Sequence, residues 1–332
     1  MSVRVGIIGV GVMGADHARI LASQVPGAEI AALYDADPVR AGAIADEIGR
    51  GGVTGSPLEL IAHPGVDAVL VASPDSTHKD LTLACIAAGK PVLCEKPLAQ
   101  SSAECAQVVA AETKFGSRLV QVGYMRRFDP ACAEMKAKLL SGRLGNALML
   151  HCIHRNVSAP AWFDSGMAIT NSAVHEFDLA RWILETELTA VQVFRPKAAA
   201  NAPGSPVFVV IETAKGQLVN VEIFNDAAYG YDVRSELVCE KGTVSLRMPG
   251  RTETNADGMQ GLDYPADWRP RFADAYRLQA QAWIKAVSSG GAAGATAWDG
   301  YAAAAVAEAG LRSLTGEGCA AVSLPQKSAI YE

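Results

Sequence analysis

The chain has 332 residues, a length typical of two domains of ordinary size. Its net charge is −6 and its Lys and Arg residues are not clustered, which excludes a protein that binds a nucleic-acid phosphate backbone. Half of the residues are hydrophobic, so each half of the chain can bury a sizeable core and most of the chain is not disordered.

The sequence also argues against a membrane protein and against a metal site. No stretch reaches the about 18 apolar residues that a membrane-spanning helix needs. The seven cysteines form no Cys-x-x-Cys pair and have no ligand-type spacing with histidine, so we expect reduced thiols and no bound metal. The first apolar run leads straight into glycines, which suits a buried strand better than a signal peptide. A cytoplasmic location is therefore expected.

The first elements predict a nucleotide-binding turn. A β-branched strand over Val3–Ile8 is followed by the glycine turn 9–14 and then by a helix. Gly9 permits a tight turn, Gly11 allows the backbone to approach a pyrophosphate, and Gly14 allows the helix to pack closely on the strand. The free N–H groups of the helix then face the phosphates. The residues expected to bind the cofactor here are Gly9, Gly11, Val12, Met13 and Gly14.

The second strand, Ala28–Tyr34, ends at Asp35, 21 residues after Gly14. This spacing is typical of the acidic residue that binds the ribose hydroxyls of the adenosine. A carboxylate repels a 2′-phosphate, so the sequence favours NAD over NADP, although the nearby Arg40 leaves NADP open. An α/β turn that binds nothing is the alternative.

The α/β alternation continues with buried strands at 66–72, 91–94 and 117–123. Ligands bind at the carboxyl ends of such strands, which makes Ser73 and Pro74 candidates for cofactor contacts. His78 begins the next helix, where contact with the cofactor and a structural cap are both open. Charges at the mouth of a buried strand need a cleft, so Glu95 and Lys96 are candidate site residues.

The second half predicts an α+β domain. Helices are expected at 129–140, 172–184, 271–288 and 300–313, and strands at 147–154, 190–194, 207–213, 218–224, 234–239 and 243–247. Closely spaced strands without intervening helices indicate a large, mostly antiparallel open sheet. The predicted fold class is α/β, with a Rossmann domain of doubly wound parallel strands over residues 1–123. An α+β domain for substrate binding and oligomerisation follows over 124–332.

The chain resembles the Gfo/Idh/MocA oxidoreductases over essentially its whole length. The residues that carry this resemblance are the glycine turn, Asp35, Glu95-Lys96-Pro97 and His175-Glu176-Phe177-Asp178. Segments 123–130, 154–156, 229–232 and 267–276 are most similar to the inositol dehydrogenase branch. The resemblance implies NAD-dependent oxidation of a cyclic polyol, with myo-inositol as the expected substrate. It also implies a homo-oligomer, a tetramer or dimer, built through the open face of the second sheet.

The resemblance assigns roles to individual residues. His175 is the expected general base, and Lys96 is expected to support the developing alkoxide and to help hold the cofactor. Asn171 stands where the family has an aspartate, four residues before the histidine. An amide can orient the imidazole but supplies no charge to stabilise the imidazolium. The expected substrate-binding residues are Lys96, Arg126, His154, Asn156, Asn171, His175 and Tyr231. Arg126 is also expected to contact the cofactor.

Other readings of the same sequence remain open. A member of the family could act on scyllo-inositol, or on an aldose or other pyranose. In a different class are a glycosidase that retains NAD without net redox change, and a regulator that binds the cofactor. His17 and His63 are expected to be helix or surface residues without a chemical role.

Overall fold

The computed structural model describes residues 2–197, 206–246 and 253–332. The chain forms two compact units that are discontinuous in sequence. Unit 1 comprises Met1–Phe128, Asp274–Ala304 and Pro325–Glu332, and unit 2 comprises Asp129–Ala273 and Ala305–Leu324. The helices α9 (Trp268–Ser288) and α10 (Ala297–Arg312) therefore each contribute residues to both units. The sequence-based division after Gly123 stays a prediction.

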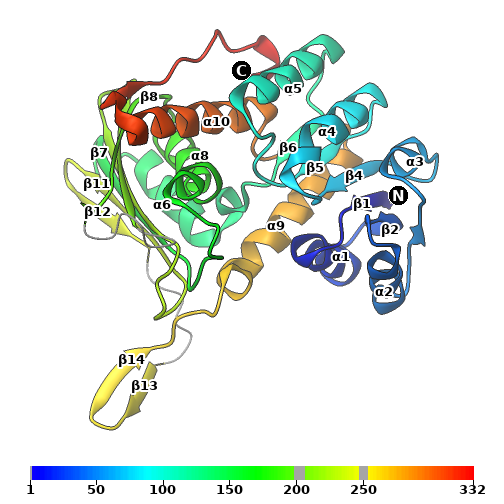
Figure 1. The fold of residues 1–332 in the computed structure, drawn as a ribbon, viewed down its shortest axis with the longest axis horizontal. Coiled ribbons are helices and arrows are strands. Elements are labelled where there is room, and N and C mark those ends of the chain that lie inside the picture. Colours follow the sequence, from blue (N-terminus) through cyan, green and yellow to red (C-terminus); the bar gives the residue numbers. More distant parts are fainter. Residues whose placement is uncertain (1, 198–205, 247–252) are drawn as a thin grey trace. The chain divides into compact units, whose positions relative to one another are not determined.

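Unit 1 contains a six-stranded parallel sheet with helices on both faces (Figure 1). The strand order is β3-β2-β1-β4-β5-β6, the order of a dinucleotide-binding Rossmann fold. Its strands are β1 Val3–Ile8, β2 Ala28–Tyr34, β3 Gly52–Val53, β4 Ala68–Val71, β5 Val92–Cys94 and β6 Val120–Val122. Its helices are α1 Val12–Gln24, α2 Pro38–Ile48, α3 Pro57–Ala62, α4 His78–Ala87 and α5 Ser102–Phe115, with short 3-10 turns η1 Asp75–Thr77, η2 Met125–Phe128 and η6 Ala329–Tyr331.

Local sequence explains these elements. The residues of β4 are all buried, as expected for a strand covered on both faces. At the start of α2 the side chain of Asp37 accepts hydrogen bonds from two backbone N–H groups, and Pro38 occupies the first turn. Gly49 ends the same helix in the left-handed conformation, at φ 68°.

Unit 2 contains a seven-stranded mixed sheet in the order β12-β11-β7-β10-β9-β8-β15. Every neighbouring pair is antiparallel except β7 and β10, so the expected mostly antiparallel sheet is confirmed. Helices α6 and α8 lie on one face of this sheet (Figure 1).

The strands are β7 Ala147–Arg155, β8 Leu188–Phe194, β9 Val207–Thr213, β10 Leu218–Phe224, β11 Asp232–Cys239, β12 Gly242–Ser245 and β15 Ala320–Ala321. The helices are α6 Pro130–Leu140, α7 Ser165–Met167, the π turn η3 Ala168–Ser172, α8 Val174–Leu184 and the π turn η5 Ser313–Glu317. Arg247, the last residue of the predicted strand 243–247, lies outside the described residues.

A hairpin that the sequence analysis did not predict extends from unit 2 (Figure 1). Its strands are β13 Glu253–Ala256 and β14 Met259–Leu262, paired so that Ala256 faces Met259. Asp257 and Gly258 both have positive φ, as a two-residue type I′ turn requires. All eight strand residues are exposed, so no buried face helped to reveal the hairpin.

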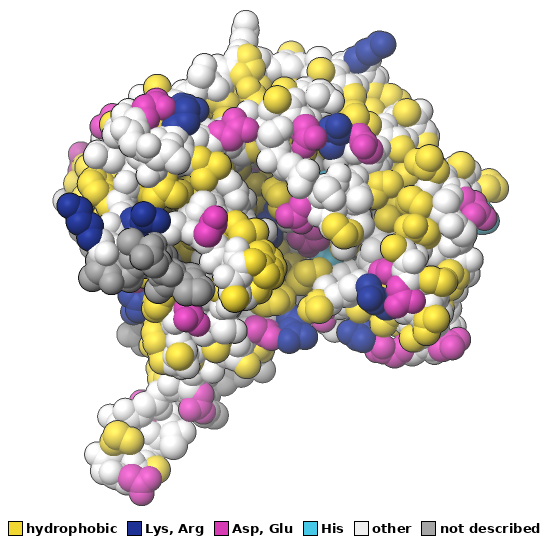
Figure 2. Space-filling model, in the orientation of Figure 1, with side chains coloured by type: hydrophobic (Ala, Val, Ile, Leu, Met, Phe, Trp, Pro, Cys, Tyr) yellow, Lys and Arg dark blue, Asp and Glu magenta, His cyan; other side chains and the backbone are white. Residues whose placement is uncertain are grey.

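On the face drawn in Figure 2, basic and acidic side chains are interspersed. Within the described ranges, no helix has both the length and the apolar character that a membrane span requires. Six of the seven cysteines are buried free thiols, whereas Cys319 is exposed.

Candidate active site

In unit 1, the turn between β1 and α1 has the geometry that a bound pyrophosphate needs. A Cβ on Gly14 would lie 1.8 Å from the carbonyl oxygen of Gly9, so only glycine fits there. A Cβ on Gly11 would meet no atom within 4 Å, so this residue faces open space. Gly11 is the N-cap of α1 and supplies no side-chain hydrogen bond, which leaves the N-terminal N–H groups of α1 for an anion. Val12 begins the helix and is exposed. These residues fit a dinucleotide.

Asp35 follows β2, as predicted. Its Oδ2 accepts a hydrogen bond from the backbone N–H of Val10 at 2.8 Å, and its Oδ1 accepts one from the backbone N–H of Asp37. The guanidinium of Arg40 lies 3.3 Å from Oδ1. The carboxylate is thus held beside the glycine turn, and Arg40 is paired with it.

His78 joins the loops that follow β4 and β5. Its Nδ1 lies 2.7 Å from the carbonyl oxygen of Pro97 and its Nε2 lies 2.8 Å from that of Ser73. Because both partners are acceptors, both ring nitrogens donate, which requires an imidazolium ion. Burial by itself would lower the pKa of His78. The neighbouring Cys94 and the two carbonyls outweigh burial and raise this pKa to about 10. The geometry favours the structural role among the two that the sequence left open.

Glu95 and Lys96 follow β5. Oε1 of Glu95 lies 2.7 Å from Nε2 of His17, which belongs to α1, and both side chains are buried. Burial by itself would raise the pKa of Glu95, but the His17 hydrogen bond and the Lys96 charge outweigh it and hold this pKa below its ordinary value. His17 does lie on a helix, as expected, but it is a buried partner of the Glu-Lys-Pro segment rather than an isolated side chain. Lys96 itself is partly exposed.

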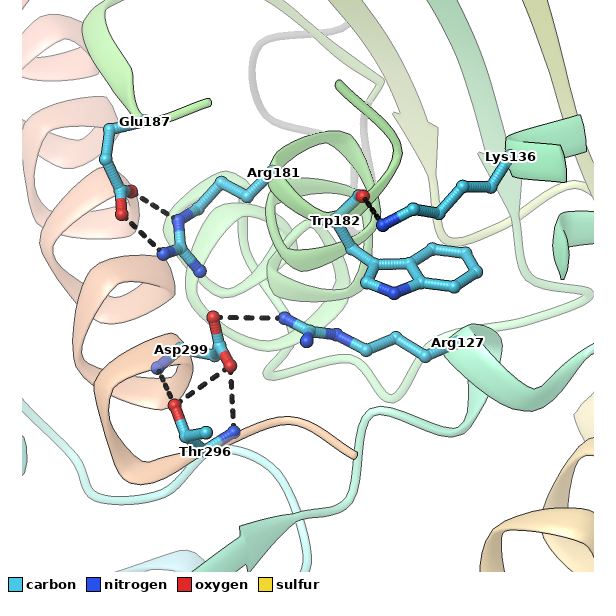
Figure 3. A network of polar contacts seen from close by, with 7 residues as sticks. All are labelled: Arg127, Lys136, Arg181, Trp182, Glu187, Thr296 and Asp299. Atoms are coloured by element: carbon cyan, nitrogen blue, oxygen red, sulfur yellow. Dashed lines mark hydrogen bonds and ion pairs between the residues drawn. The ribbon is translucent and has the colours of Figure 1, made fainter. Parts of the chain in front are cut away.

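Arg126 lies in η2 and is 2% exposed. The next residue, Arg127, is anchored by an ion pair with Asp299 of α10, at 3.1 Å (Figure 3). Asp299 in turn accepts hydrogen bonds from the backbone N–H and the hydroxyl of Thr296. This network fixes the short turn that carries Arg126.

In unit 2, His175 lies in the first turn of α8 and is 8% exposed. The predicted helix 172–184 begins only at Val174, because residues before it form the π turn, in which the Ala173 N–H bonds to the carbonyl of Ala168. Asn171 lies in that π turn. Asn171 and His175 are therefore not part of one continuous α-helix, and the role of Asn171 beside His175 stays a prediction.

The His154 ring lies close to those of His175 and Tyr231. The ring centroids of His154 and His175 are 6.4 Å apart, and the Tyr231 ring meets that of His154 edge-on at 6.3 Å. Nδ1 of His154 lies 3.0 Å from Oε2 of Glu176, and both side chains are buried. Unit 2 therefore gathers three of the predicted substrate-binding residues beside a carboxylate to which the sequence analysis gave no role.

Asn156 belongs to a second polar group. Its side-chain amide donates to Oδ1 of Asn225, which also accepts the Ser172 hydroxyl at 3.0 Å. Asn225 and Ser172 are buried. Sequence reasoning missed both residues, since no motif marks Asn225 after β10.

Ion pairs hold the carboxyl end of the helix that carries His175 (Figure 3). Arg181 binds both carboxylate oxygens of Glu187, at 2.6 and 2.8 Å. Lys136 of α6 donates to the carbonyl oxygen of Trp182 at 2.8 Å and lies over the Trp182 ring. These contacts tie the end of α8 to α6 and to the loop that precedes β8.

Comparison with known proteins agrees with the dinucleotide-binding geometry of unit 1 and the α+β architecture of unit 2. The Gfo/Idh/MocA family model described as "Oxidoreductase family, NAD-binding Rossmann fold" matches residues 3–124. A second model, "Oxidoreductase family, C-terminal alpha/beta domain", matches residues 136–321. The chain belongs to the Gfo/Idh/MocA oxidoreductase family. The resemblance predicted from the sequence is thereby confirmed, as are the fold class, the NAD cofactor and the activity class of a dehydrogenase.

Other members of the Gfo/Idh/MocA family match this chain over its whole length. It is 51% identical over 335 residues to inositol 2-dehydrogenase 1 of Saccharopolyspora erythraea, covering 100% of this chain and 99% of the relative. It is 48% identical to an inositol 2-dehydrogenase of Streptomyces avermitilis, covering 93% and 91%. The crystal structure of myo-inositol dehydrogenase from Lactobacillus casei with NAD(H) and myo-inositol superposes with a TM-score of 0.95, at 30% identity and full coverage of both chains.

In the described part of the chain, no group of three or more His, Cys, Asp or Glu side chains has an arrangement that could hold a metal ion.

Proposed function

We propose that this protein oxidises a secondary alcohol of a cyclic polyol to a ketone with NAD, and that myo-inositol is its substrate. The observation that carries the proposal is the group of buried hydrogen-bonding side chains around His154 and His175 in a chain that also has a dinucleotide-binding unit. A polyol presents many hydroxyls, and such a site rejects analogues that lack them. The full-length relatives named inositol 2-dehydrogenases support the same substrate class.

Bound NAD supplies the acceptor for the hydride that leaves the substrate carbon. His175 takes the hydroxyl proton, because an imidazole has a pKa suited to a base near neutral pH. Lys96 donates a hydrogen bond to the same oxygen and stabilises the developing alkoxide. Asn171 orients His175, while Arg126, His154, Asn156 and Tyr231 hold the other hydroxyls. The substrate thus loses one hydride and one proton and leaves as a ketone.

In unit 1, the glycine turn binds the pyrophosphate and Asp35 binds the adenosine ribose. Val12, Met13, Ser73, Pro74, Glu95 and Arg126 complete the predicted set of cofactor-binding residues. His78 contributes to this set indirectly, because its ring binds the carbonyl oxygens of Ser73 and Pro97 in the two loops.

The test is NAD reduction by the purified protein with myo-, scyllo- and chiro-inositol, glucose, xylose and galactose, each also with NADP. We expect rapid reduction of NAD with myo-inositol. Loss of the side chain in His175→Ala or Lys96→Ala should lower kcat by about 10²- to 10⁴-fold. Activity on pyranoses alone would keep the proposed chemistry but identify a sugar, rather than an inositol, as the substrate. No reduction with any polyol, despite NAD binding, would contradict the proposal.

We also propose that the protein is a homotetramer that works in the cytoplasm. The sheet face opposite α8 carries exposed apolar side chains, among them the paired neighbours Phe194 and Phe208. Covering such a face in a second copy removes apolar surface from water. The free thiols suit a reducing compartment. Light scattering of the wild type and of Phe208→Glu tests the assembly, since the variant should dissociate.

A further inference from the structure

Glu95 directly precedes Lys96 in the sequence and is paired with His17 of α1. Nε2 of His17 is 2.7 Å from Oε1 of Glu95, although the two residues are 78 positions apart. His17 is 1% exposed and Glu95 is 8% exposed. A buried ionisable pair of this kind is costly unless its hydrogen bonds are well made, so its presence calls for a reason.

The charge state of Glu95 fixes the direction of this hydrogen bond. The pKa of Glu95 is held below its ordinary value, so at neutral pH the group is a carboxylate, which only accepts. Nε2 of His17 therefore carries the hydrogen and donates it. The Tyr276 and His17 rings pack nearly perpendicular to each other, with centroids 5.6 Å apart. In the described part of the chain, Nδ1 of His17 has no hydrogen-bond partner, so its polar anchor is Glu95.

The second carboxylate oxygen of Glu95 acts on Lys96. Oε2 accepts a hydrogen bond from the backbone N–H of Lys96, at 3.2 Å. Glu95 thus links a helix side chain to the backbone from which the Lys96 side chain extends. If the carboxylate rotated or moved, this backbone N–H would lose its partner.

The backbone around Glu95 leaves little room for such a movement. The Glu95 N–H bonds to the carbonyl of Val71 in β4, and the Gly123 N–H bonds to the carbonyl of Cys94. A Cβ on Gly123 would lie 2.8 Å from Oε2 of Glu95, so the chain after β6 is packed directly on the carboxylate. From α1, the His17 ring contacts the other carboxylate oxygen, Oε1.

We propose that His17 and Glu95 form a positioning dyad that holds Lys96 in place for the alkoxide, an inference that rests on the proposed role of Lys96. Neither residue touches the reacting atoms. A misplacement of about 1 Å in a group that contacts the transition state costs about 100-fold in rate, so a dyad of this kind acts on kcat.

The experiment compares three single variants with the wild type. His17→Leu removes the donor, and His17→Gln offers an amide N–H at a similar distance along the side chain. His63→Leu is the matched control, because His63 is an exposed histidine of the same unit. We expect His17→Leu to lower kcat at saturating NAD about 10- to 100-fold. His17→Gln should recover most of that loss, and His63→Leu should behave as the wild type.

The outcomes separate the dyad from the proposed function. If Lys96→Ala keeps the wild-type kcat, the role of Lys96 itself is wrong. If Lys96→Ala loses activity while folded His17→Leu retains the wild-type kcat, only the dyad is overturned. A loss of kcat in His17→Leu that His17→Gln does not recover would point to packing and also contradicts the dyad. Should His17→Leu not fold, the isosteric Glu95→Gln decides the matter, with a fall in kcat expected and an unchanged kcat contradicting the dyad.

Discussion

The His154 ring is held by the Glu176 carboxylate, with 3.0 Å between Nδ1 and Oε2. Both side chains are buried, and an ionised Glu176 can only accept, so in that form Nδ1 of His154 carries the hydrogen. In the neutral ring, Nε2 then presents a lone pair. This tautomer suits a group that accepts a hydrogen bond from a substrate hydroxyl, which is the role proposed for His154.

Replacement of Glu176 by glutamine should weaken binding of the polyol. The amide can donate as well as accept, so it no longer fixes the tautomer of His154. We expect the KM for myo-inositol to rise about tenfold, equivalent to one hydrogen bond of about 1.4 kcal/mol, with little change in kcat. Steady-state kinetics of Glu176→Gln measures this. Glu212→Gln, at an exposed position, is the control, and an unchanged KM in both variants would refute the role of Glu176.

The substitution Asn171→Asp should change the pH dependence of the reaction. A carboxylate near His175 favours the imidazolium and so raises the pKa of the base. The acidic limb of the kcat/KM profile should therefore move to higher pH, because the base stays protonated over a wider range. A profile identical to that of the wild type would show that residue 171, which lies in the π turn, does not act on His175.

Much of the fold could be predicted because short sequence patterns indicate most of its strands and helices. The bounds of β1, β2, β9 and β10 agree with the predicted ranges to the residue. The start of α8 did not agree, because the hydrogen bonds of the preceding π turn span five residues instead of four, a difference that hydrophobic spacing does not show. The exposed hairpin β13–β14 was missed for lack of an apolar face, although its Asp257-Gly258 turn is a hairpin signal.

Sequence reasoning found the motif residues of the candidate site but not their partners. His17 and Glu95 are 78 positions apart, and Ser172 and Asn225 are 53 apart. Such pairs form only when the topology brings distant elements together, so spacing along the chain cannot reveal them. Glu176 was visible within a family motif, but its role became apparent only from the geometry of the neighbouring strand.

Asp35 should control the choice between NAD and NADP. Its carboxylate repels a 2′-phosphate and also holds Arg40 at 3.3 Å. In Asp35→Ser the repulsion disappears and Arg40 becomes available to a phosphate, so the ratio of kcat/KM for NADP to that for NAD should rise at least about tenfold. Adding Arg40→Ala should remove this gain. A cofactor preference that stays with NAD in Asp35→Ser would contradict the assignment.

His78 should stabilise the protein in a pH-dependent way. Its pKa is raised to about 10 in the folded protein, above the ordinary value of 6.5. Its stabilisation is therefore fully present below pH 6.5, declines above that value and is lost as the pH rises through about 10. His78→Gln leaves a buried carbonyl unpaired and should lower the free energy of unfolding by about 1–3 kcal/mol at pH 6. Urea unfolding at pH 6, 8 and 10 should show this difference shrinking with pH, and a constant difference would exclude the imidazolium.

Gly11 and Gly14 provide a matched pair that separates cofactor binding from folding. A Cβ on Gly14 would lie 1.8 Å from a backbone oxygen, so Gly14→Ala should lower the free energy of unfolding by about 3 kcal/mol or more. A Cβ on Gly11 would meet nothing in the protein, and its φ of −65° suits alanine, so Gly11→Ala should fold with an unchanged Tm. The new methyl group would nevertheless occupy the space that the pyrophosphate needs at the start of α1. We therefore expect NAD affinity to fall about tenfold or more in Gly11→Ala, as measured by fluorescence titration. Wild-type NAD affinity in that variant would show that the pyrophosphate does not approach Gly11.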